Sequence, residues 1–126
     1  MNDVLKMENI TCFQGLLKNL NEFSQLVLNI LDNNDSEELF QNLTHFIDDH
    51  NIRQEKSDLK LILHTISNIS NNHYRASNFL GKIERILQLF SNEIKNFYTN
   101  FEIFSIFKDN KRILLFLFEE KIITPD

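Results

Sequence analysis

The sequence predicts an all-α fold of about six antiparallel helices in a single domain, residues 1–126. Three observations support this. Apolar residues recur three and four positions apart along most of the chain, which places them on one face of a helix. Glycine occurs twice and proline once, too little turn punctuation for a strand-rich fold. A chain of this length can also bury about two-thirds of its unfolded surface, so a core forms without disulfides.

The first predicted helix spans roughly residues 9–31 and ends in a polar run whose side chains compete with helical hydrogen bonds. A second helix is predicted to open at Asp35, with Glu38 three residues later completing a capping box, and to fade near His50. Each helix carries one apolar face. In the first these residues are Phe13, Leu16, Leu17, Leu20, Phe23, Val27, Ile30 and Leu31, and in the second Leu39, Phe40, Leu43, Phe46 and Ile47.

The third predicted helix follows a short polar stretch. Ser57 is expected to cap it, and Asp58 lies in its first turn, where the helix dipole favours a carboxylate. We expect the helix to end at Asn71 and Asn72, with a left-handed asparagine closing it. His64 is predicted to face solvent, opposite the apolar face. That face comprises Leu59, Ile62, Leu63, Ile66 and Ile69.

Ser77 or Asn78 opens the fourth predicted helix, which runs without a break to about residue 97. Its apolar spacing is the most regular in the chain. A single long helix is therefore expected, with one side in the core and charged residues on the other. The core residues are Phe79, Ile83, Ile86, Phe90, Ile94 and Phe97, widened by Leu80 and Leu87.

The last two predicted helices are short. Thr99 and Glu102 form a capping box for the fifth, and Asp109 or Asn110 caps the sixth. Residues 113–118 are apolar without interruption, a run that a buried strand would also show. We expect a helix, because charged residues lead directly into this run and continue directly after it.

These two helices are more apolar than a single contact between them can bury. We expect the surplus to be covered by the fourth helix, by a neighbouring repeat after Asp126 or by a partner chain. As buried residues, Phe104 and Leu115 are each expected to lose about 2–5 kcal/mol of folding stability on truncation to alanine. The aromatic residues concerned are Phe101, Phe104, Phe107, Phe116 and Phe118.

Charge and targeting features limit the classes of partner and compartment. Residues 1–56 carry 10 acidic and 4 basic residues, a net −6, while residues 57–126 carry 8 and 9, a net +1. The acidic first part argues against nucleic acid or an anionic membrane as a main partner. No signal peptide is apparent, the apolar runs are too short to cross a bilayer, and Cys12 has no second cysteine to pair with. A cytoplasmic protein is expected.

No complete catalytic or metal-binding set is present, so neither an enzyme nor a cofactor is predicted. The nearest candidate for a metal site is the group His45, Asp48, Asp49 and His50, in which His45 and Asp49 share a helix face. It lacks the spacing of a metal motif, and adjacent aspartates at a helix end are more often solvated. A third hypothesis, from another class, is a hydrolase or metal enzyme built on His45 and Asp49 or on His73.

Two groups of polar residues at predicted turns are candidates for partner binding. The first follows the third helix, where it could form a recognition tip. The alternative, which we favour, has its tyrosine packing back on the helices and its cations bonding helix-end carbonyls. The second is a basic cluster between the last two helices, suited to acidic groups of a partner, although a solvated corner is the simpler interpretation. The first group is His73, Tyr74 and Arg75, and the second is Lys108, Lys111 and Arg112.

Residues 57–126 contain a series of short motifs: NISNNHYR from Asn68, NF from Asn78, KI from Lys82, EIF from Glu102, IF from Ile106, NKRILLFL from Asn110 and EKIIT from Glu120. Together they resemble the N-terminal region of large ankyrin-repeat proteins of parasitic protists, notably trichomonads. Residues 1–56 match that region only in being helical and acidic.

The resemblance implies a non-enzymatic, all-helical leader or cap that precedes an array of ankyrin repeats and helps it bind protein partners. The C-terminal helical hairpin is similar to a degenerate ankyrin unit, with Lys121 where a terminating glycine would be expected. The alternative is a free-standing helical adaptor that oligomerises through its Phe-rich C-terminal hairpin. The resemblance carries no catalytic residue.

Overall fold

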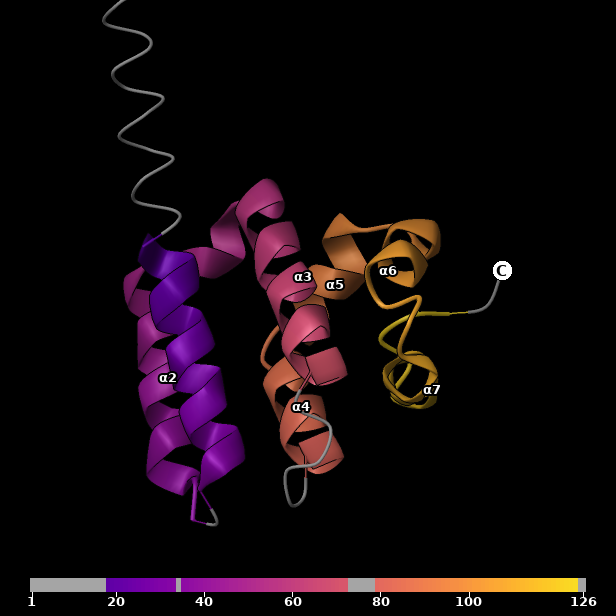
Figure 1. Cartoon of the computed structure of the whole chain (residues 1–126). Helices are drawn as coiled ribbons and strands as arrows, with labels where there is room; N and C mark the ends of the chain where they lie inside the picture. Colours follow the sequence, from indigo (N-terminus) through magenta and orange to yellow (C-terminus); the bar gives the residue numbers. More distant parts are fainter. Residues whose placement is uncertain (1–17, 34, 73–78, 125–126) are drawn as a thin grey trace, which may run out of the picture.

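The computed structural model describes residues 18–33, 35–72 and 79–124, and all regular structure in these ranges is helical (Figure 1). The all-α prediction is confirmed. The first helix occupies residues 18–32 of this part, and the rest of its predicted span lies outside the described residues. The further elements are α2 (Glu37–Asp49), the 3-10 turn η1 (Ile52–Gln54), α3 (Lys56–Asn72), α4 (Phe79–Gln88), α5 (Ser91–Phe97), α6 (Asn100–Ile106) and α7 (Lys111–Glu119).

The helices share one hydrophobic core. Phe23, Phe90 and Phe107 are its largest fully buried side chains. The ring centres of Phe23 and Phe90 lie 6.5 Å apart, so the first helix packs against the end of α4. Figure 1 shows the first helix and α2 on one side, α3 and α4 in the middle, and α6 and α7 on the other side. All five apolar residues predicted for the face of the third helix are buried, and His64 is exposed, as predicted.

Two basic residues of α4, Lys82 and Arg85, bind the first helix and α2. The ammonium of Lys82 donates to the backbone carbonyls of Leu31 at 3.2 Å and Asn33 at 2.8 Å, at the end of the first helix. Carbonyls at a helix C-terminus attract a positive charge. One turn further along α4, the guanidinium of Arg85 donates two hydrogen bonds to the carboxylate of Glu37 in α2, at 2.9 and 2.7 Å. These contacts fix the first two helices against α4.

α2 begins one residue later than predicted. Its N-cap is Ser36, no side chain forms a cap hydrogen bond there, and the predicted capping box of Asp35 with Glu38 is therefore wrong. Two glutamates in the first turn stabilise this end instead, because they face the positive end of the helix dipole. The left-handed Asn51 follows the helix, and the η1 turn after it buries Ile52 in the core.

Both ends of α3 differ from the prediction. Ser57 lies inside the helix rather than capping it, because helical backbone bonding already starts from the carbonyl of Glu55. Asp58 occupies the first turn, as predicted. At the far end both asparagines are helical, and the side-chain amide of Asn72 donates to the carbonyl of Asn68 at 2.9 Å. The predicted left-handed asparagine is therefore wrong.

The fourth predicted helix is two helices, because the chain breaks at Leu89 and Phe90. Their amides bond carbonyls three residues back, which tightens the last turn of α4. In a continuous helix the carbonyl of Leu89 would accept from the amide of Glu93. Arg53 of η1 takes that carbonyl instead, with its Nε donating at 3.0 Å. A side chain 36 positions earlier thus ends α4.

The predicted caps of the last two helices are confirmed. Thr99 and Glu102 exchange the two hydrogen bonds of a capping box, each 3.2 Å long. The side-chain oxygen of Asn110 accepts from the amide of Ile113 at 3.2 Å and caps α7. The apolar run of residues 113–118 is helical, so it is not a strand.

α7 ends in a Schellman motif, in which a left-handed residue turns the chain back. That residue is Lys121, with φ of 57°. Its amide bonds the carbonyl of Phe118 at 3.0 Å, and the amide of Ile122 bonds that of Leu117 at 2.9 Å. Lys121 thus has the backbone conformation of the glycine that usually occupies this place.

Candidate functional site

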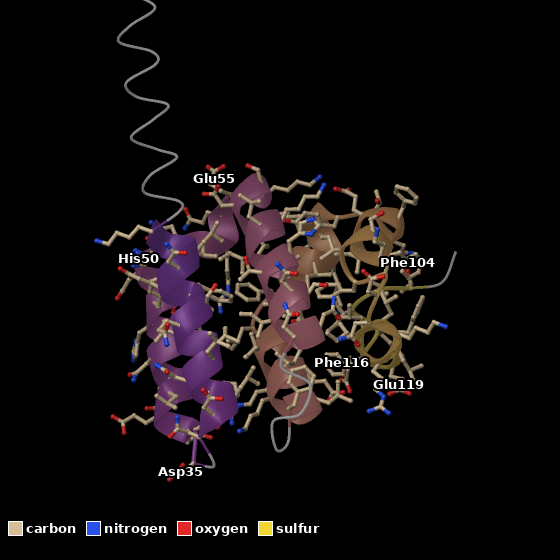
Figure 2. The ribbon with its side chains drawn as sticks, in the orientation of Figure 1. Asp35, His50, Glu55, Phe104, Phe116 and Glu119 are labelled. Carbon is tan, nitrogen blue, oxygen red and sulfur yellow. The ribbon has the colours of Figure 1, made fainter. Side chains whose placement is uncertain are left out.

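α6 and α7 each attach to the rest of the molecule by one side. α6 contacts α3, where the hydroxyl of Ser67 donates to the carbonyl of Ile106 at 2.9 Å, and α7 contacts α4. Figure 2 shows Phe116 on the side of α7 toward the other helices and Phe104 at the outer edge of the molecule. The fully buried residues of the two helices and the link between them are Ile103, Phe107, Ile113 and Leu117.

Phe101, Phe104 and Leu115 on α6 and α7 are exposed, and Phe118 is half-buried beside the core. We call these four residues the apolar patch. Phe101 is 77% exposed, Leu115 57% and Phe104 37%. The rings of Phe104 and Phe118 lie 5.6 Å apart and join α6 to α7. The prediction that Phe104 and Leu115 are core residues is wrong. Each helix has only two or three turns, and other residues already fill its inner side.

The members of the patch adjoin one another: Phe101 and Phe104 lie three positions apart on α6, Leu115 and Phe118 do so on α7, and the contact of Phe104 with Phe118 joins the two pairs. Single exposed apolar side chains are common, whereas a contiguous group on one face usually marks a contact surface. Three of its members are aromatic, the residue type that supplies most binding energy at interfaces. The patch is therefore the strongest candidate site in the described residues.

α7 carries its charges against its own dipole. Lys111 and Arg112 occupy its first turn and Glu119 its last, although a helix N-terminus favours anions and a C-terminus favours cations. At an exposed surface each reversed charge costs on the order of 0.3 kcal/mol. Acidic residues also gather near the C-terminal end of α7, where Glu119 and Glu120 lie close to Glu84 of α4. Burial raises the pKa of Glu84, and the carboxylates of Glu119 and Glu120 raise it further. Helix stability does not explain this arrangement.

The predicted basic cluster is on the surface. Lys108, Lys111 and Arg112 are exposed and line an open groove of about 760 Å³. The groove lies between the end of α3, the start of α4 and the link between α6 and α7. Within the described ranges these three residues form no ion pair. Asp109 lines the same groove, and the binding of acidic partner groups by this cluster stays a prediction.

His73, Tyr74 and Arg75 lie outside the described residues. The nearest described groove residues on either side of this segment are Asn71 and Phe79. Both line the groove that carries the basic cluster. The recognition role predicted for His73, Tyr74 and Arg75 stays a prediction.

The group proposed as an alternative metal site does not assemble into one. The carboxylate of Asp48 lies 2.6 Å from the guanidinium of Arg53. The ring of His50 packs edge-on against that of Phe46, with the ring centres 4.3 Å apart. His45 and Asp49 line a shallow groove between the first helix and α2. In the part of the chain that the structure describes, no three His, Cys, Asp or Glu side chains gather closely enough to hold a metal ion.

A further cluster of perturbed groups has a structural role. The hydroxyl of Tyr98 donates to the backbone carbonyl of Lys56, and burial, with the nearby carboxylate of Glu102, raises the pKa of Tyr98 to about 12. The backbone hydrogen bond from Thr99 lowers the pKa of Glu102, helped by Lys56 and by Lys60 at 3.9 Å. These contacts join the start of α3 to the start of α6.

Comparisons with known proteins give no family for this chain. A scan against protein-family models, a search of curated proteins and a search of solved structures each found no significant match. Among the described helices, none combines the length and the apolar character needed to cross a membrane.

Proposed function

We propose that this chain is a non-enzymatic protein–protein interaction module whose contact face is the apolar patch. The single observation that carries the proposal is the exposure of Phe101 and Leu115 on helices that the core otherwise holds firmly. Leaving such side chains in water is unfavourable, so covering them with a partner stabilises the complex. The partner is a protein rather than nucleic acid or membrane, because the chain carries a net charge of −5. The lone Cys12 suits a cytoplasmic setting.

In its first form, the module is the helical leader or cap of an ankyrin-type repeat array. The resemblance of residues 57–126 supports this form, as does the presence of a short helix pair with an apolar outer face. Stacked helical repeats cover such faces with the next unit. The patch would then lie against the first repeat.

In its second form, the module is a free-standing adaptor that oligomerises through the Phe-rich C-terminal hairpin. The specific observation in favour is the aromatic pair of Phe104 and Phe118, which bridges α6 and α7 on the outer face. The two forms place different occupants on the same patch.

Cysteine labelling tests whether the patch is a contact face. In a Cys12→Ser background, Leu115→Cys reports on the patch, and Leu61→Cys on α3 is the matched control, since Leu61 is 41% exposed. Maleimide labelling is compared between dilute purified protein and an extract of the native cells. We expect Leu115→Cys to react about tenfold more slowly in the extract, the factor for a face covered in nine chains of ten, while Leu61→Cys is unchanged.

Equal labelling rates for Leu115→Cys and Leu61→Cys in the extract would contradict the proposal. The concentration dependence of the protection separates the two forms. Self-association protects Leu115→Cys in the purified protein as its concentration rises, whereas a repeat array protects it only where the array is present.

A further inference from the structure

We propose that a second copy of this chain binds the patch, with the two α7 helices crossing antiparallel about Leu115. The inference rests on the proposed function in its self-associating form. It goes further by naming the partner, the orientation and the residues that set the register. The observation behind it is the order of charges along the exposed side of α7.

Three exposed residues form a ridge on α7. Lys111, Leu115 and Glu119 follow one another at intervals of four, so their side chains lie in one row along the helix. Leu115, in the middle, is 57% exposed. Rows of this spacing are the ones that interdigitate in the commonest class of helix–helix contact.

The ridge is complementary to itself. Each charged residue lies four positions from Leu115, which is about 6 Å along the axis. A twofold rotation through Leu115 reverses the direction of the helix and exchanges its ends. Lys111 then faces Glu119 of the second copy, and Glu119 faces Lys111 of the second copy. One contact thus contains two opposite-charge pairs around a central leucine pair, the pattern of an isologous interface.

A parallel arrangement of two copies in the same register is unfavourable. Parallel helices in the same register place Lys111 against Lys111 and Glu119 against Glu119, which repel. In the described part of the chain neither residue has an ion-pair partner, so both are available to the second copy. The helix dipoles also favour the antiparallel arrangement, because each positive end meets a negative end. The reversed charges of α7, unfavourable within one chain, become favourable across the pair.

The rest of the patch fits the same contact. Phe118 follows Leu115 by three positions on α7, which places the two on neighbouring turns. Phe104 packs on Phe118 from α6. Phe101, at 77% exposure, extends the apolar surface along α6. Apolar residues at the centre with charged residues at the ends match the anatomy of protein interfaces. The contact is small, so we expect a weak and reversible dimer.

Sedimentation equilibrium of the full chain tests the dimer at concentrations up to the order of 100 μM. Leu115→Glu places two carboxylates at the centre and is expected to weaken association about a hundredfold. Leu61→Glu makes the same change on α3, outside the ridge, and should leave association unchanged. Both positions are exposed, so both variants keep their fold, which circular dichroism verifies.

Charge exchange tests the antiparallel register. Lys111→Glu or Glu119→Lys alone makes both pairs of the dimer repulsive, and each is expected to weaken association about tenfold in low salt. The double variant with both substitutions restores two attractive pairs and should associate like the wild type. Mixing the two single variants also restores both pairs, so the mixture should form a heterodimer more readily than either variant associates alone.

The outcomes distinguish this inference from the proposed function. A chain that stays monomeric over this range overturns the dimer, while protection of Leu115→Cys in a native extract would still support a contact face with another occupant. Association that Leu115→Glu abolishes but charge exchange leaves unchanged overturns the antiparallel register and keeps self-association through the patch. Association that survives Leu115→Glu removes both the dimer proposed here and the role of the patch in self-association.

Discussion

The Nε atom of Arg53 donates a hydrogen bond to the backbone carbonyl of Leu89 at 3.0 Å, where α4 gives way to α5. The same guanidinium contacts Asp48 at 2.6 Å and lies 6.0 Å from the ring centre of Phe90. Its side chain is 29% exposed, so these contacts are partly shielded from water. Arg53 thus holds together the end of α2, the η1 turn and the break between α4 and α5.

Removing this side chain should destabilise the fold. For Arg53→Met we expect a loss of about 1–2 kcal/mol in the free energy of unfolding, because the carbonyl of Leu89 loses its donor and Asp48 its counter-charge. Urea denaturation monitored by circular dichroism measures the change. Arg112→Met, at an exposed position, is the control and should change stability by less than about 0.5 kcal/mol. Equal effects of the two substitutions would show that the Leu89 contact contributes nothing.

The pair of Glu37 and Arg85 predicts an acid-dependent contribution to stability. The hydrogen bonds from Arg85 lower the pKa of Glu37 below its ordinary value of 4.5. A carboxyl with a depressed folded-state pKa stabilises the fold above its unfolded pKa, and the contribution disappears as pH falls through the folded value. The stability difference between wild type and Glu37→Gln should therefore be present near neutral pH and vanish in acid.

The pair is exposed, so that difference is small and shrinks further in salt. Glu38→Gln, in the same turn of α2 but outside the pair with Arg85, is the matched control. Carbon-detected NMR titration measures the pKa of Glu37 directly. In Arg85→Met it should return to the ordinary range, and an unchanged pKa would contradict the assigned cause.

Lys121 predicts a stabilising substitution. A left-handed backbone is unfavourable for any residue with a Cβ atom, and glycine avoids that cost. For Lys121→Gly we expect a gain of about 0.5–1 kcal/mol in thermal or urea unfolding. Lys95→Gly, inside α5, should instead lose about 1 kcal/mol because glycine weakens a helix interior. A loss in both variants would mean that the Schellman motif is not strained at Lys121.

The two sides of the C-terminal helices should respond differently to truncation. Phe107 is fully buried, so Phe107→Ala leaves a cavity and is expected to cost about 3–5 kcal/mol. Leu115→Ala should cost less than about 0.5 kcal/mol, because its side chain already faces water. Both are measured by urea unfolding in dilute protein, where association is negligible. A large loss for Leu115→Ala would show that the outer face is covered within the chain itself.

Apolar spacing predicts a helix correctly where one continuous face of that helix is buried, as in α3 from Leu59 to Ile69. The same spacing hides the break after α4, since Ile86, Phe90 and Ile94 keep intervals of four across it. The break depends on Arg53, which is distant in the sequence, and no local pattern reveals such a contact. Caps were predictable only where the side chain itself bonds the backbone, as Thr99 and Asn110 do.

The site was predictable only in part. The sequence identifies Lys108, Lys111 and Arg112 as a surface cluster, because charged residues at a turn seldom become buried. It does not show that Phe104 is exposed and Phe107 buried, because both are apolar and the sequence does not reveal which side of a short helix a neighbouring helix covers. The interval from Lys111 through Leu115 to Glu119 was visible in the sequence. Its meaning depends on Leu115 lying at the surface, which only packing decides.

The contacts of Lys82 and Arg85 in α4 also determine when the first helix and α2 become fixed during synthesis. Lys82 is separated by 51 and 49 positions from Leu31 and Asn33, and Arg85 by 48 from Glu37. Contacts between such distant positions form late, because a long segment must close first. On the ribosome the first helix and α2 therefore wait for α4 to emerge before they are fixed. A chain released before α4 is complete would expose the side chains that Phe90 and its neighbours cover, and would be a target for chaperones.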